Sequence, residues 1–358
     1  MTHPLTDHGE RIAQHGAKKP SMSTPEIAVV GAGVIGLSCA IRLQEKGFPV
    51  DIYAEKQTPD TTSDRAGAVF SPFRIDGHPA AARWTKASYH TFVELAEQRD
   101  AFCGVSMTTL RELFFAPLEQ HPWWSEFVQG YERLGGIAPR YADAVTGVMP
   151  KMDMRRYMPW LTRQFVVSQG GSIVLGKLAR LDALFDLGYR VIVNCSGLGA
   201  GELVKDRAMR PRRGQLLHVA PIAGLDECIV EDSCGATATY VFPFEDYTVL
   251  GGTYELYAWS EVPQEADLAA IVERCRAMLV ACGYPAPADF AERPLRTLAG
   301  LRPSRCVGDS DEAVRIECER LGDHRWIVHN YGHGRAGVTL SWGCADQAAD
   351  LVEEALGR

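Results

Sequence analysis

The chain has 358 residues, of which 46% are hydrophobic and 23% are charged, and its net charge at neutral pH is −8. This length allows two lobes with a sizeable core. The negative charge argues against nucleic acid and anionic membranes as partners, because both require a basic face. No apolar run is long enough to span a bilayer, and residues 1–24 lack the apolar segment of a secretory signal. We interpret residues 1–24 as a disordered extension.

The cysteines and other potential ligands show no pattern that points to a metal or a disulfide framework. Ten cysteines are present without a C-x-x-C pair or regular spacing. His, Cys and acidic residues do not cluster at the spacing of metal ligands. We therefore expect reduced thiols, no metal site and a cytoplasmic location.

The first apolar run predicts a strand, a tight turn and the start of a helix. Four apolar residues at 27–30 lead into Gly31, Gly33 and Gly36, which have the spacing G-x-G-x-x-G. The free N–H groups and the positive helix end at such a turn suit a pyrophosphate. The next predicted strand ends in Glu55, whose carboxylate can accept hydrogen bonds from a ribose. The pattern predicts binding of an adenine dinucleotide and leaves both NAD and FAD open.

The next part of the chain mixes loops, a helix and short strands. A polar loop at 58–65 is rich in hydroxyl groups and is typical of a surface turn, with contacts to a phosphate or ribityl chain as the alternative. Residues 79–97 have the pattern of an amphipathic helix. Two short strand-like runs follow, around 107–110 and 113–115.

A second group of elements returns the chain to the nucleotide-binding lobe. A helical run at 155–169 is followed by a short strand at 172–175. An apolar strand beginning at 189 then ends in the small-residue turn Ser196-Gly197, and a helix follows. We therefore expect this lobe to be assembled from pieces that are separated in the sequence.

The segments after residue 210 predict a second sheet. Runs at 214–219, 238–242 and 247–251 are typical of strands in a mainly antiparallel sheet. Apolar residues at helical spacing predict a helix over 268–282.

The last part of the chain predicts a turn, two strands and a helix. Residues 297–303 predict the turn, because they contain a glycine and a proline that break regular structure. Strands are expected at 313–317 and 326–329. The glycine-rich run 331–337 leads into a C-terminal helix, so the order strand, glycine turn, helix occurs a second time.

Several motifs resemble those of the D-amino-acid oxidases, in the same order and over roughly residues 25–355. They are VVGAGVIGLS at 29–38, YAE at 53–55, TTSD at 61–64, RGQ at 213–215, GLRP at 300–303 and HNYGHGRAGVTLSWG at 329–343. The resemblance implies FAD rather than NAD. It also implies an α/β fold, in which a Rossmann-like FAD-binding domain is interleaved with a substrate domain built on a mainly antiparallel β-sheet.

The resemblance, combined with the element order, implies a division into two domains. We expect the FAD-binding domain to comprise residues 25–75, 151–210 and 298–358. The substrate-binding domain would comprise 76–150 and 211–297.

The resemblance also implies roles for individual residues. Arg302 matches the arginine that binds the substrate carboxylate, and Tyr240 matches the tyrosine whose hydroxyl contacts the same group; both residue types suit this chemistry. Arg335 stands where many members have a small residue, so it either meets a second carboxylate on the substrate or points to solvent. The segment 232–239 is short and has no tyrosine to serve as a lid, which implies open access. The positions expected to contact the cofactor are Gly31, Ala32, Gly33, Val34, Ile35, Gly36, Glu55, Lys56, Thr62, Ser63, Ala68, Val69, Leu178, Ser196, Gly334, Arg335, Gly337, Val338 and Thr339.

The implied reaction is oxidative deamination of a D-amino acid. A hydride passes from Cα to flavin N5, water hydrolyses the imine to a 2-oxo acid and ammonia, and oxygen reoxidises the flavin with release of hydrogen peroxide. A D-amino acid and oxygen are therefore the expected partners, and a homodimer is left open. The alternative is a glycine or sarcosine oxidase of the same fold. An NAD-dependent dehydrogenase and a non-catalytic flavin-binding protein are more remote alternatives.

Overall fold

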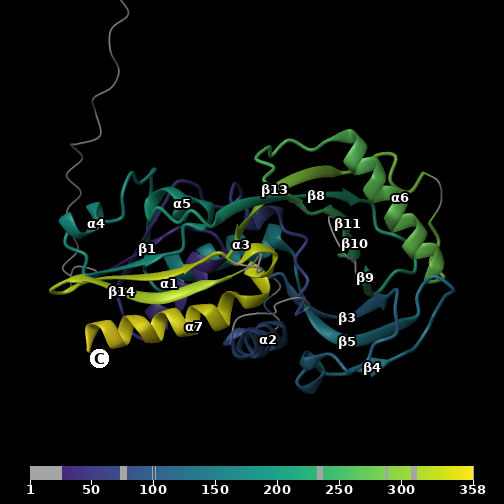
Figure 1. Ribbon diagram of the computed structural model, residues 1–358, viewed down its shortest axis with the longest axis horizontal. Helices are drawn as coiled ribbons and strands as arrows, with labels where there is room; N and C mark the ends of the chain where they lie inside the picture. The colour runs from purple at the N-terminus through teal and green to yellow at the C-terminus, as the bar shows by residue number, and fades with distance from the viewer. Residues whose placement is uncertain are drawn as a thin grey trace, which may run out of the picture.

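The computed structural model has two β-sheets with helices packed against them (Figure 1). The extension predicted at 1–24 and most of the short segment before Tyr240 lie outside the described residues. The residues that the structure describes are 26–72, 79–98, 100, 102–231, 237–286, 289–307 and 313–357.

The smaller sheet has six strands in the order β14-β15-β7-β1-β2-β6. Neighbouring strands are parallel, except that β14 and β15 are antiparallel. Every residue of β1 and β7 is buried, as expected for central parallel strands covered on both faces. The strands are β1 Ile27–Val30, β2 Val50–Ala54, β6 Ser172–Leu175, β7 Val191–Asn194, β14 Arg315–Gly322 and β15 Arg325–Tyr331.

Helices cover both faces of this sheet because successive side chains of a strand point to opposite sides. Val29 and Val193 belong to the same core cluster as Leu37 of α1. Ala28 packs instead in the cluster that contains Leu184 of α4. Helices α1 and α7 lie side by side on the first face, and α2 packs against α7 (Figure 1). The helices are α1 Val34–Glu45, α2 Ala81–Glu97, α3 Met154–Arg163, α4 Ala183–Asp186, α5 Ala200–Leu203 and α7 Gly337–Leu356.

The larger sheet has nine strands and is mainly antiparallel, as predicted. Eight strands follow the order β12-β8-β11-β10-β9-β3-β5-β4, and β13 pairs with β8. Only β3 and β9 form a parallel pair among them. Helix α6, Glu265–Ala281, packs its apolar side chains on β8, β10 and β11. The strands are β3 Val105–Phe114, β4 Glu132–Arg133, β5 Asp143–Met152, β8 Met209–Val219, β9 Cys228–Glu231, β10 Thr237–Pro243, β11 Thr248–Thr253, β12 Glu255–Leu256 and β13 Arg296–Arg305.

Two local predictions are wrong. Residues 297–303 do not form a turn, because strand β13 runs through them and pairs with β8 over ten residues. The long partner strand outweighs the local breaker signals, and a strand that pairs on one edge tolerates a proline such as Pro303. The two short runs near residue 110 are one strand, β3, whose partner β5 was not predicted. The division into two domains stays a prediction.

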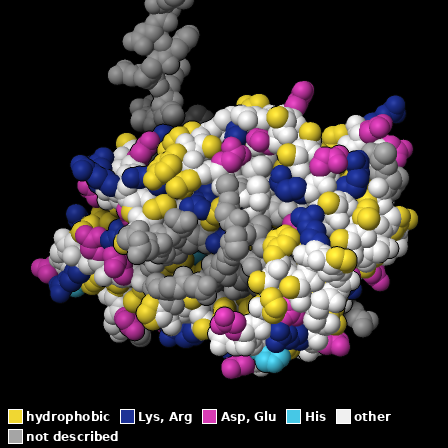
Figure 2. All heavy atoms as spheres, turned by 45° about the vertical axis from the view of Figure 1, so that its right-hand side comes forward, with side chains coloured by type: hydrophobic (Ala, Val, Ile, Leu, Met, Phe, Trp, Pro, Cys, Tyr) yellow, Lys and Arg dark blue, Asp and Glu magenta, His cyan; other side chains and the backbone are white. Residues whose placement is uncertain are grey.

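The described surface mixes charges of both signs. Figure 2 shows one face on which Lys and Arg side chains alternate with Asp and Glu, and no sign dominates it. None of the described helices has the combination of length and apolar character that crossing a membrane requires. Within the described part of the chain, residues of both sheets line a cavity that can enclose a ligand.

Candidate active site

A cavity of about 880 Å³ is lined by residues from both sheets, and its volume lies near the upper end of the range for small-molecule and cofactor sites. The cavity is lined by the carboxyl ends of strands β1 and β2 of the smaller sheet and by side chains of β8, β10 and β13 of the larger sheet. All of the predicted site residues except Gly36 line this cavity. The structure therefore brings together side chains that are far apart in the sequence.

The first glycine turn forms one wall of the cavity. Gly31 has φ +115°, and a Cβ there would overlap the carbonyl oxygen of Cys195, so only glycine fits this position. A Cβ on Gly36 would overlap the carbonyl oxygen of Gly31. Gly36 thus lets α1 approach the turn closely and does not itself line the cavity. Helix α1 has no acidic residue in its first turn, which leaves its N-terminus attractive to an anion.

The hydroxyl-rich loop 58–65 packs against this turn. Ser63, in the short helix η1 (Ser63–Arg65), accepts a hydrogen bond from the N–H of Val34 at 3.0 Å. The Asp64 carboxylate accepts bonds from the hydroxyls of Thr58 and Thr61, both at 2.6 Å, which fixes the loop. The remaining lining positions predicted on this side of the cavity are Ala32, Gly33, Ile35, Glu55, Lys56, Thr62, Ala68, Val69, Leu178 and Ser196.

The second glycine turn lies at the end of β15. Gly334 begins the short helix η5, Gly334–Ala336, and α7 starts at Gly337. Burial lowers the pKa of His333 to about 3, so its imidazole is neutral at physiological pH. Within the described residues, Nε2 of His333 has no hydrogen-bond partner, although the residue lines the cavity. An unsatisfied buried group of this kind costs about 1–3 kcal/mol, which a polar ligand group would relieve.

The guanidinium of Arg302 lies over β8, the strand that pairs with β13. The side chain projects from β13, and its Nη1 donates to the carbonyl oxygen of Thr253 at 3.1 Å. Its guanidinium rests on Gly214 of β8, where any Cβ would overlap it. Gly214 therefore provides the space that holds the guanidinium in the cavity.

Tyr240 is also positioned by a glycine on a neighbouring strand. Its ring rests on Gly251, its register partner in β11, where a Cβ would overlap the ring. On the same strand its ring stacks on Phe242, with centroids 4.7 Å apart. Burial raises the pKa of the Tyr240 phenol, and the positive charge of Arg302 acts in the opposite direction. The phenol is therefore protonated at neutral pH and can donate a hydrogen bond to an anion.

A third aromatic residue, Tyr254, was not predicted to belong to the site. It follows β11 directly and lines the cavity. The guanidinium carbon of Arg302 lies 5.5 Å from the centroid of its ring, and that of Arg335 lies 5.0 Å from the same centroid. The buried residue Arg212 stacks on this ring at 4.0 Å. No local pattern in the sequence marks Tyr254, because its neighbours come from three other segments.

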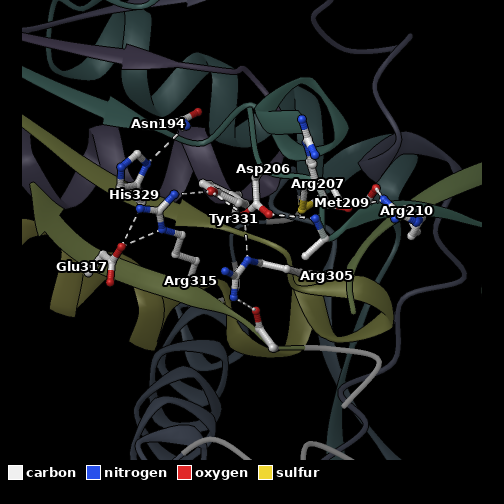
Figure 3. Close-up of polar contacts among 12 residues, drawn as sticks. Asn194, Asp206, Arg207, Met209, Arg210, Arg305, Arg315, Glu317, His329 and Tyr331 are labelled. Carbon is white, nitrogen blue, oxygen red and sulfur yellow. Dashed lines mark hydrogen bonds and ion pairs between the residues drawn. The ribbon is translucent and has the colours of Figure 1, made fainter. Parts of the chain in front are cut away.

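A buried carboxylate links the strand that carries Arg302 to the second glycine turn. Asp206 accepts a bond from the Tyr331 hydroxyl at 2.8 Å and one from Nε of Arg305 at 2.7 Å (Figure 3). Tyr331 ends β15 just before the turn, and Arg305 ends β13. An isolated bridge between Ser304 and His333 joins the same two segments. Asp206 thus fixes β13 relative to the turn.

Comparisons with known proteins show which family the chain resembles. Residues 26–351 match the family described as DAO, FAD dependent oxidoreductase. The chain is 38% identical to a D-amino-acid oxidase of Rubrobacter xylanophilus, over 92% of this chain and 96% of that protein. It is 32% identical to a D-aspartate oxidase of Homo sapiens, over 93% and 96%. The crystal structure of a glycine oxidase from Geobacillus kaustophilus superimposes with a TM-score of 0.71 at 17% identity, over 92% of this chain and 94% of that one.

The chain therefore belongs to the DAO family of FAD-dependent oxidoreductases. Its cavity fits FAD on three independent features: a turn that only glycine can form at Gly31, a helix start without acidic residues at α1, and the unsatisfied Nε2 of His333. The turn at Gly31 and the start of α1 would hold the pyrophosphate. Residues of the turn at Gly334, which also line the cavity, would help to hold the cofactor.

Proposed function

We propose that this protein is an FAD-dependent oxidase that converts a D-amino acid, water and oxygen into a 2-oxo acid, ammonia and hydrogen peroxide. The observation that carries the proposal is the presence of Arg302 and Tyr240 in the same cavity as the two glycine turns. A relative at 38% identity bears the name D-amino-acid oxidase. When bound, FAD supplies an acceptor for the hydride of Cα and passes the electron pair to oxygen.

Under this proposal the side chains bind and orient the substrate. Arg302 would bind the α-carboxylate with two parallel hydrogen bonds, since a planar guanidinium matches a carboxylate. Tyr240 would donate a third bond to the same carboxylate, because its raised pKa keeps the phenol protonated. Two donors on rigid strands fix the direction in which Cα–H points, and this orientation is the main contribution of the protein to the rate. No side-chain base is required.

The remaining expectations belong to the same proposal. They are oxygen as the electron acceptor, a cytoplasmic location, a homodimer and the contacts predicted for each cofactor-binding residue. Glycine or sarcosine oxidation is the alternative function. The glycine oxidase structure at 17% identity supports only the shared fold, so we favour a D-amino acid.

Anaerobic mixing of the FAD-loaded enzyme with single amino acids tests the proposal. We expect bleaching of the visible flavin absorbance with D-alanine, D-proline, D-asparagine or D-aspartate, and none with their L-enantiomers. Hydrogen peroxide should form when oxygen is admitted. Faster bleaching by glycine or sarcosine than by every D-amino acid would establish the alternative, and no bleaching by any of them would refute an oxidase function.

A further inference from the structure

We propose that Arg213 and Gln215, which flank Gly214 in the RGQ motif, position the substrate-binding arginine from the face of the larger sheet that points away from the cavity. The inference rests on the proposed function and assigns positioning residues to the same site. It starts from a motif in which a glycine stands between two large polar residues.

The motif presents its side chains to opposite faces of the sheet, because successive side chains of a strand alternate. Of the described residues 213–216, Gly214 and Leu216 line the cavity, whereas Arg213 and Gln215 do not. These two polar side chains point to the face that α6 covers, together with Leu217, which packs in the same cluster as the apolar residues of α6. Arg213 is 3% exposed and Gln215 is fully buried. A buried guanidinium and a buried amide are costly unless they have partners, so their partners carry the argument.

The partners come from β12 and from the start of α6. Nε of Arg213 donates to Oε1 of Glu255 at 3.1 Å, and Nε2 of Gln215 donates to the same oxygen at 3.0 Å. Oε1 of Gln215 accepts from the N–H of Gln264, the residue before α6, at 2.7 Å. Burial acts to raise the pKa of Glu255, but donors led by Arg213 and Thr253 outweigh it and hold the pKa below its ordinary value. The carboxylate is therefore charged at neutral pH, and its hydrogen bonds are of the strong, charge-assisted kind.

Thr253, the last residue of β11, connects these groups to the substrate-binding arginine. Its hydroxyl oxygen accepts the N–H of Gln215 at 3.1 Å and donates to Glu255. Its carbonyl oxygen accepts the bond from Nη1 of Arg302 at 3.1 Å. Arg213, Gln215, Thr253 and Glu255 are together named the RGQ network. The network thus fixes the carbonyl group that orients the guanidinium, while Gly214 leaves room for it on the cavity side.

The substitution Glu255→Gln tests the network, because it removes the charge and nearly preserves the shape. Arg213 keeps a second carboxylate partner, Asp267 at 3.6 Å, so we expect the variant to fold. The probe is propionate, which has a carboxylate and no amino group to be oxidised, so titration calorimetry measures its Kd for the FAD-loaded enzyme without turnover. We expect this Kd to rise by about tenfold, because Arg302 is held less firmly, and the Kd for FAD to change by less than about twofold.

Thr253→Val is a second, independent variant. It removes the hydroxyl through which the network reaches the carbonyl group, and it should raise the Kd for propionate by a similar factor. The double variant with Glu255→Gln should bind propionate at most about twofold more weakly than the weaker of the two single variants, because both changes act through one residue.

Asp143→Asn is the matched control for a general loss of stability. It neutralises a buried carboxylate of the same sheet that is paired with Arg133. Both residues are described, and neither lines the cavity. The control should lower Tm and leave the Kd for propionate unchanged, whereas the variants of the RGQ network should raise this Kd.

Four results would overturn the inference. They are an unchanged Kd for propionate in Glu255→Gln and Thr253→Val, a double variant whose fold-change equals the product of the single ones, an equal rise in Asp143→Asn, and no binding of propionate to the wild type. The proposed function fails on a different observation, which is that no amino acid bleaches the flavin. The calorimetric comparison does not depend on turnover, so it decides the role of the RGQ network in either case.

Discussion

Gly214 offers a test of how the larger sheet holds the substrate-binding arginine. In the variant Gly214→Ala, the added methyl carbon would lie 2.2 Å from both terminal nitrogens of Arg302, whereas ordinary contacts begin at 3.4 Å. The guanidinium must therefore move by about 1.2 Å, the difference between these two distances. This displacement removes its 3.1 Å bond to Thr253 and misaligns both nitrogens with the α-carboxylate.

The expected effect is a loss of substrate binding with little loss of stability. One hydrogen bond to a charged group contributes about 1.5–3 kcal/mol, so KM should rise by about 10- to 100-fold. The group that must move is the end of a flexible side chain, and alanine within a strand is more stable than glycine by about 0.5–1 kcal/mol. We expect the FAD spectrum to be unchanged and Tm to be no lower than that of the wild type.

Steady-state oxygen uptake, the FAD spectrum and a thermal melt measure these effects. A double-mutant cycle with Arg302→Ala then isolates the cause. Once the guanidinium is absent, Gly214→Ala should change KM by less than about twofold, because nothing remains to be displaced. An unchanged KM in Gly214→Ala would refute the idea that Gly214 positions Arg302. So would a double variant whose fold-change in KM equals the product of the two single fold-changes, because the two residues would then act independently.

Three further predictions concern the rest of the site. Tyr240→Phe should raise KM by about 10- to 100-fold through loss of one hydrogen bond to the charged α-carboxylate, with Tm unchanged because the ring still stacks on Phe242; an unchanged KM or a large fall in Tm would contradict this. Gly31→Ala should yield colourless protein that FAD does not restore, since φ +115° and the carbonyl oxygen of Cys195 exclude a Cβ; normal FAD binding would disprove the fit. Asp206→Asn should lower the free energy of unfolding at pH 7 by about 1.5–3 kcal/mol and raise KM, because the link through Arg305 and Tyr331 between β13 and the second turn is weakened and only the bridge between Ser304 and His333 is unaffected. Burial acts to raise the pKa of Asp206, but bonds from Arg305, the Ala208 N–H and Tyr331 outweigh it and hold the pKa below its ordinary value. The stabilisation by this carboxylate is thus complete above its unfolded pKa of about 3.9 and is lost as the pH falls through the lower folded pKa. Chemical denaturation at a series of acidic pH values should show that the free energy of unfolding falls more steeply with decreasing pH in the wild type than in Asp206→Asn. Equal slopes of the free energy of unfolding against pH would argue against the role of Asp206.

Much of the cofactor-binding half of the site could be predicted from the sequence because its signals are local. A glycine turn depends on a few consecutive residues, and the positive φ of Gly31 is a property of the backbone itself. The strand before the first turn is apolar throughout because it is buried on both faces, and the strand before the second turn has the apolar run 326–328 at its centre. The start of the helix that follows each turn was equally visible, since helical periodicity extends over neighbouring residues.

The substrate side of the cavity depends on contacts between distant segments. Arg302 lies in a stretch whose local signals predict a turn, and only pairing with β8 makes it a strand. That pairing places the guanidinium over Gly214, and the same fold brings Tyr254 beside Arg302 and Arg335. The sequence by itself thus determined the two turns and the chemical types of the binding residues. The tertiary structure alone decided which side chains share one cavity, because strand pairing and packing between remote segments leave no periodic trace in the chain.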